Sequence, residues 1–125
     1  KILADLGLSP LNKFLLVYWF SLGFIVLDQM TNISEITTTL AELGSVAAAI
    51  DVVAAALILY GAYLLYNKKK QGAIIAIATG VVSGIYWTFL AQTAGDFPIE
   101  FVAIYMVTFI VMVAGPVLLF PDEYS

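Results

Sequence analysis

The sequence contains no cysteine, no histidine and no arginine. Without cysteine the chain can form neither a disulfide nor a thiolate metal site, and its redox compartment cannot be inferred. Without histidine it lacks the commonest metal and haem ligand and the usual general base. Scattered carboxylates and serines make neither a metal centre nor a hydrolase site. We therefore expect no catalytic residue, no bound cofactor and no metal site, so the chain is not expected to be an enzyme.

Charge is also scarce. Only 11% of the 125 residues are charged, and nine acids against five lysines give a net charge of -4. A nucleic-acid-binding protein needs a basic face, so nucleic acid is not an expected partner. By contrast, 62% of the residues are hydrophobic, and the mean hydropathy is +1.02. A soluble domain of this size cannot bury so much apolar surface, so the composition predicts an integral membrane protein.

Four apolar runs are long enough to cross a bilayer, which takes about 20 helical residues. They cover about 10–27, 45–66, 72–94 and 98–120. Ser9-Pro10 and the stretch 96–100 are typical of helix starts, and Gly115-Pro116 is expected to bend or loosen the last turn of the fourth run. The predicted fold is an all-α integral membrane protein, a four-transmembrane-helix bundle that forms a single domain over residues 1–125.

All five lysines fall on one side of such a bundle. Lys1 and Lys13 flank the start of the first span, and Lys68, Lys69 and Lys70 fill the connection between the second and third. The other two connections contain no lysine. The positive-inside rule therefore predicts that both termini are cytoplasmic, in a multi-pass protein of the plasma membrane.

The connection over residues 28–44 is the longest. Within it Ile33, Ile36, Leu40 and Leu43 recur at spacings of three and four, which is typical of an amphipathic helix. We expect an amphipathic outer segment here that leads into the second span, and a second interfacial segment over residues 1–8. The tripeptide that begins at Asn32 matches the N-glycosylation acceptor pattern, so Asn32 is a candidate modification site.

Asp51 is the candidate functional residue, because an ionisable group inside a membrane span is costly and favours a functional role. It lies a few residues inside the outer end of the second span. The antiparallel third span places Thr88 and Gln92 at a similar depth. We expect Asp51 to be protonated and hydrogen-bonded to one of these groups, or paired with a basic residue of another subunit. A proton- or cation-carrying role is the alternative.

Small residues recur every four positions along the third span. These positions are Gly72, Ala76, Gly80 and Gly84. The second span offers Ala47 and Ala55, one turn on either side of Asp51. Small side chains let helix backbones approach closely, so the pattern predicts a tight contact between the second and third spans. Packing against a different polypeptide is the alternative.

Two classes of function remain. The first is a non-catalytic accessory or structural subunit of a larger membrane complex, of respiratory or oxidase type. Its partners would be lipids and other integral membrane subunits, which it would contact through the small-residue helix faces. The alternative is a small homo-oligomeric transporter or channel, coupled to protons or cations through Asp51.

Overall fold

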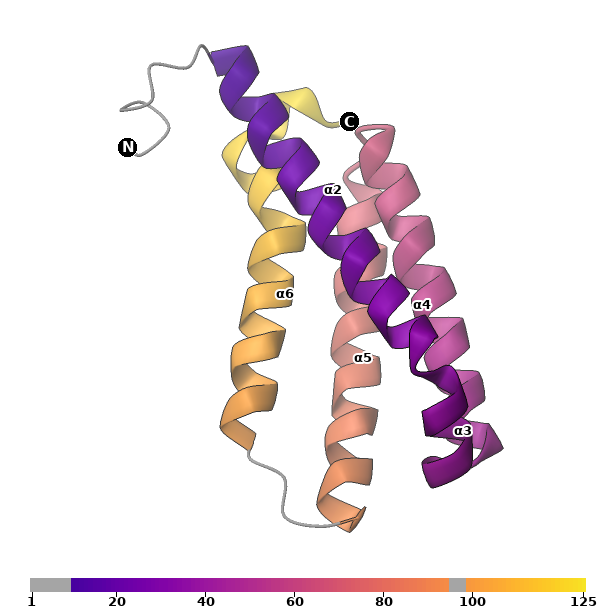
Figure 1. The fold of residues 1–125 in the computed structure, drawn as a ribbon. Helices are drawn as coiled ribbons and strands as arrows, with labels where there is room; N and C mark the ends of the chain where they lie inside the picture. The colour runs from indigo at the N-terminus through magenta and orange to yellow at the C-terminus, as the bar shows by residue number, and fades with distance from the viewer. Residues whose placement is uncertain (1–9, 95–98) are drawn as a thin grey trace.

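The computed structural model describes residues 10–94 and 99–125. Within them nearly all residues lie in helices: α2 (Pro10–Ser34), α3 (Ile36–Leu43), α4 (Ser45–Tyr66), α5 (Gln71–Ala94), α6 (Ile99–Leu119) and the 3-10 turn η1 (Pro121–Glu123). Figure 1 shows α2, α4, α5 and α6 running along one another as a bundle. Both α2 and α5 pack against α4 and α6. The predictions made for residues 1–9 and 95–98 lie outside the described residues.

Four of the described helices are long and apolar enough to cross a membrane, over Lys13–Ser34, Ser45–Tyr66, Gln71–Leu90 and Ile99–Leu119. This confirms the predicted all-α bundle with four candidate spans. The first boundary was wrong, because α2 continues seven residues beyond Leu27. The polar pair Asp28-Gln29 suggested a helix end, but Gln29 is only 2% exposed and Tyr105 of α6 donates a hydrogen bond to Asp28. A polar pair that is satisfied inside the bundle does not end a helix.

The segment between α2 and α4 forms a separate helix, α3, and not an extension of α4. Gly44 separates the two with a φ of 95°, a conformation that side chains other than glycine rarely adopt. Its N–H donates to the Leu40 carbonyl, and its own carbonyl accepts from the N–H of Ala48. Since α3 packs against α4 while Leu40 stays half exposed, its amphipathic placement on a membrane surface stays a prediction.

The connection between α4 and α5 is a tight turn that carries three consecutive lysines. Lys68 adopts a left-handed φ of 60°. The N–H groups of Lys68 and Lys69 donate back to the carbonyls of Leu65 and Leu64, each at 2.9 Å. This is the Schellman pattern, which satisfies carbonyls that a helix end leaves free. Lys13, in the first turns of α2, lies at the same end of the bundle (Figure 1), which we call the lysine end; α3 marks the opposite, α3 end.

An aromatic cluster around Phe14 closes the lysine end. Phe14 is 1% exposed, and its ring centroid lies 5.3 Å from that of Tyr18, 5.4 Å from Phe120 and 5.9 Å from Tyr124. The Tyr18 hydroxyl also donates a hydrogen bond to the carbonyl of Tyr66, the last residue of α4. The cluster therefore joins α2 to the end of α4 and to the segment that follows α6.

The closest approach of two helix backbones joins α4 and α5 near the lysine end. A Cβ placed on Gly72 would overlap the carbonyl oxygen of Gly61, and a Cβ on Gly61 would lie 2.7 Å from the carbonyl oxygen of Gly72. Ala76, one turn further along α5, is fully buried and would lie 3.1 Å from the same added atom on Gly61. Gly72 and Ala76, the two small residues of the series nearest the lysine end, therefore make the predicted contact with the second span.

The next two small residues of the series, Gly80 and Gly84, contact a different helix, α6. A Cβ on Gly80 would overlap the Phe109 ring, and a Cβ on Gly84 would lie 2.7 Å from the Met106 sulfur, both on α6. At 3.6 residues per turn, each four-residue step rotates the series by about 40° around the helix, so the two steps from Gly72 to Gly80 carry it from α4 to α6. The expectation of one small-residue face toward the second span is corrected accordingly.

Pro116 interrupts the backbone hydrogen bonding of α6 three residues before its end. Proline has no N–H, so the carbonyl of Met112, four residues earlier, loses its usual partner. The hydroxyl of Ser21, which is 4% exposed on α2, donates to this carbonyl instead. The helix therefore runs on to Leu119 with its free carbonyl satisfied by a neighbouring helix, as apolar surroundings require.

The contact between Gly61 and Gly72 makes a direct prediction for stability. Gly72→Ala should lower the free energy of unfolding by about 1–3 kcal/mol, because the added methyl group meets rigid backbone atoms. Gly23→Ala is the matched control: nothing lies within 4 Å of its added Cβ, so it should be neutral or slightly stabilising. Unfolding in detergent micelles measures both, and equal stabilities would refute the close contact.

The pairing of Ser21 with Met112 predicts a coupling in a double-mutant cycle. Ser21→Ala should cost about 1 kcal/mol, since it leaves the Met112 carbonyl without a donor. In a Pro116→Ala background the new N–H at position 116 supplies that donor, so the same Ser21→Ala change should cost close to nothing. Equal costs in the two backgrounds, measured by unfolding in micelles, would rule out the proposed compensation.

Candidate functional site

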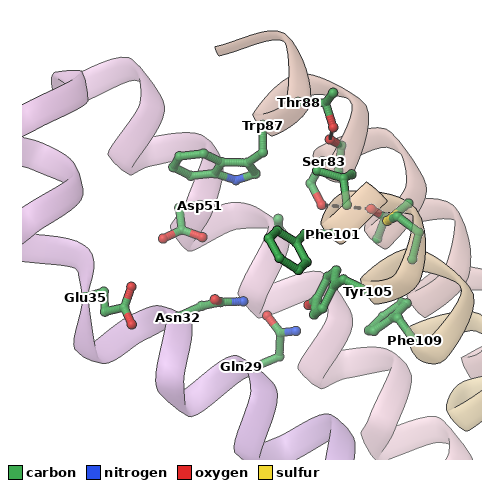
Figure 2. A pocket seen from close by; sticks show the side chains of 15 residues that line it. Gln29, Asn32, Glu35, Asp51, Ser83, Trp87, Thr88, Phe101, Tyr105 and Phe109 are labelled. Atoms are coloured by element: carbon green, nitrogen blue, oxygen red, sulfur yellow. Dashed lines mark hydrogen bonds between the residues drawn. The ribbon is translucent and has the colours of Figure 1, made fainter. Parts of the chain in front are cut away.

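A cavity of about 510 Å³ opens between the helices in the half of the bundle nearer the α3 end. Figure 2 shows side chains from α2, α4, α5 and α6 around it. Its polar lining consists of Gln29, Asn32, Glu35, Asp51, Ser83, Thr88 and Tyr105. The rest of the lining is apolar or aromatic: Ala54, Gly80, Gly84, Trp87, Phe101, Val102, Met106 and Phe109. The cavity thus combines carboxylates with aromatic walls.

Asp51 lies on the wall that α4 contributes. It is 9% exposed, and Ala47 and Ala55, one turn before and after it, are 2% exposed each. These short side chains leave the carboxylate as the polar group of this helix face, and Figure 2 shows it among the side chains that line the cavity. The Glu35 carboxylate lines the same cavity, so the two negative charges repel each other.

The structure brings Thr88 to the same cavity but does not join it to Asp51. The Thr88 hydroxyl donates to the carbonyl of Gly84, one turn earlier in α5, at 2.7 Å. The side chain of Gln92 lies outside what the structure describes. Among the described residues no side chain donates a hydrogen bond to Asp51, so its pairing with a group of another subunit stays a prediction.

A second carboxylate of this region, Asp28, accepts two hydrogen bonds, and sequence reasoning missed them. The Tyr105 hydroxyl donates to its Oδ2 atom at 2.6 Å, and Gln29 Nε2 donates to the same atom at 3.0 Å. These bonds tie α6 to α2 beside the cavity. No local pattern signals this contact, because Asp28 and Tyr105 are 77 positions apart in the sequence.

The position of Asn32 differs from the exposed loop that its acceptor tripeptide suggested. It lies in the last turn of α2, is partly buried and lines the cavity. A glycan at this position would have to displace part of the cavity wall. Its modification stays a prediction that this position does not favour.

The described lining contains carboxylates and no basic residue. The described lysines lie at the opposite end of the bundle: Lys13 in α2 and Lys68, Lys69 and Lys70 in the α4–α5 turn. Within residues 10–94 and 99–125, no group of three or more His, Cys, Asp or Glu side chains is placed to hold a metal ion. The cavity is therefore an electronegative site with aromatic walls.

Comparisons with protein-family models, with curated proteins and with solved structures found no match. The fold itself defines the class: four long apolar helices form a multi-pass membrane helical bundle, here with an acidic cavity between them.

Proposed function

We propose that this chain is a non-catalytic accessory subunit of a larger membrane complex, in the plasma membrane. The observation that carries the proposal is an apolar groove of about 620 Å³ on the surface of the bundle, between α4 and α5. Short side chains line much of it, at Ala49, Ala54, Ala78, Thr79 and Ser83. Short side chains expose helix backbone, which lets a third helix approach closely.

The groove does not include the glycines that hold the bundle together, although Ala54 and Ser83 line both the groove and the cavity. Gly72 already contacts α4, and Gly80 and Gly84 already contact α6, so these glycines are not free for a partner. Large parts of α5 and α6 do remain uncovered, because only 17% of each candidate span is buried inside the bundle. In this proposal, partner helices and lipids cover the remainder.

We propose a complex of respiratory or oxidase type, in which the chain would need no ligand chemistry of its own. Respiratory and oxidase complexes hold haems and metal ions on ligands such as histidine and cysteine, and this sequence contains neither. In such an assembly the chain would surround or stabilise a cofactor-bearing core and contribute no ligand to it.

A second candidate is a small homo-oligomeric transporter or channel coupled to protons or cations. The cavity favours it, because the buried Asp51 carboxylate faces a space large enough for a solute. An ionisable residue at such a position can couple transport to proton or cation binding.

The orientation is part of the proposal: both termini and the α4–α5 turn in the cytoplasm. The clustering of Lys13 and Lys68–Lys70 at the lysine end supports it. Because the chain has no cysteine, single cysteines at Glu42 and Lys69 can be probed with an impermeant thiol reagent on intact cells. Position 42 should be labelled from outside and position 69 should not; the reverse pattern would invert the topology.

The groove can be tested by filling it. Ala78→Phe should block a partner helix and lower the recovery of the intact complex from native membranes in mild detergent. Ala103→Phe is the control, since Ala103 is exposed on α6 and lies outside the groove. Recovery that is equal for the two variants would contradict the accessory role.

The Asp51→Asn variant distinguishes the two candidate functions when assembly and flux are both measured. For an accessory subunit, Asp51→Asn should leave assembly and activity largely intact, because asparagine keeps the size and hydrogen-bonding capacity of the side chain. Loss of flux in liposomes with normal assembly would favour the transporter instead.

A further inference from the structure

Asp51 lies on a largely buried helix face, and its carboxylate opens onto the cavity. It is nine-tenths buried, and no described residue donates a hydrogen bond to it. It is the seventh residue of α4. A helix N-terminus stabilises negative charge only within the first turn, and Asp51 lies beyond it. The neighbouring Glu35 adds repulsion. Since a buried carboxylate is stabilised chiefly by a partner of opposite charge, the space in front of Asp51 is suited to a cation.

The described chain does not supply that cation. Lys13 and Lys68–Lys70 lie at the opposite end of the bundle, and the described carboxylates do not form a metal-binding group. A positive charge can reach Asp51 with a molecule that enters the cavity, whose volume of about 510 Å³ lies in the range of small-ligand sites.

The walls indicate which kind of cation fits. Trp87 of α5 and Phe101 of α6 line the cavity together with Asp51 (Figure 2). Aromatic ring faces attract organic ammonium groups, and tryptophan does so most strongly. A carboxylate combined with such rings favours an alkylammonium group over a small hydrated metal ion, which would need several oxygen ligands.

We propose that this cavity binds a small organic cation of the alkylammonium class, with the Asp51 carboxylate as its counter-ion and the Trp87 and Phe101 rings as its walls. Glu35, at the junction of α2 and α3, adds negative potential at the same cavity and attracts the cation. The site goes beyond the accessory role and does not depend on it, because every residue that forms it belongs to this chain.

Trp87 provides the readout, because the sequence has two tryptophans and the other, Trp19, is 56% exposed and does not line the cavity. The full chain carrying Trp19→Phe is placed in lipid nanodiscs and titrated with tetramethyl-, tetraethyl- and tetrapropylammonium chloride, with sodium chloride matched for ionic strength. At least one member of the series should give a saturable change in Trp87 fluorescence that sodium chloride does not give.

Variants then assign the contacts. Asp51→Asn should weaken binding at least tenfold, and Phe101→Leu should weaken it by about three- to tenfold through loss of one aromatic wall. Glu42→Gln is the matched control: Glu42 is an exposed carboxylate of α3 that does not line the cavity, so the affinity should stay unchanged. If Asp51→Asn does not fold, Glu35→Gln replaces it and should weaken binding about two- to fivefold.

Two results would overturn the proposal. One is the absence of saturable binding for every member of the series, which would mean that Asp51 is neutralised by a proton or by a side chain of another subunit. The other is equal affinity in the Asp51→Asn and Glu42→Gln variants. Either result leaves the assembly measurement untouched, so this site and the accessory role can fail separately.

Discussion

The bundle depends on one constraint: in an apolar medium every backbone N–H and carbonyl needs a partner within the protein. Helices meet this need except at their ends and at prolines. In this chain α2 supplies the missing donors. Its Tyr18 hydroxyl reaches the last carbonyl of α4, and its Ser21 hydroxyl reaches the carbonyl that Pro116 leaves free in α6. The helix α2 thereby supplies a donor to one free carbonyl in each of its two neighbours, α4 and α6, and fixes their positions along its axis.

The same helix continues this role toward the α3 end. There the Tyr105 hydroxyl of α6 donates to Asp28 of α2, so the two helices are joined by polar contacts at Ser21 and again at Asp28. On the other side of the bundle, polar groups are replaced by close packing, at the backbone contact of Gly61 and Gly72. The bundle is therefore joined by hydrogen bonds around α2 and by small residues around α5.

The sequence was sufficient to predict the four spans, because a run of about 20 apolar residues has few alternatives to a membrane helix. It was sufficient to single out Asp51 for a related reason, since the charge stands inside such a run. It was not sufficient to place the end of α2. Asp28 and Gln29 read as a boundary as long as Tyr105 is not known to lie beside them. A contact between residues 77 positions apart leaves no local pattern.

The cavity was hidden from the sequence for the same reason, and the two aspartates show what the fold adds. Both lie in the half of the bundle near the α3 end, but Asp28 accepts hydrogen bonds from Tyr105 and Gln29, whereas no described residue donates one to Asp51. Packing alone does not account for a carboxylate at position 51, because alanines occupy the turns before and after it and a further alanine would continue that surface. A buried charge without a partner costs stability that a neutral residue would not. In our proposal, the acid at this position is the counter-ion of a cation bound in the cavity that it faces.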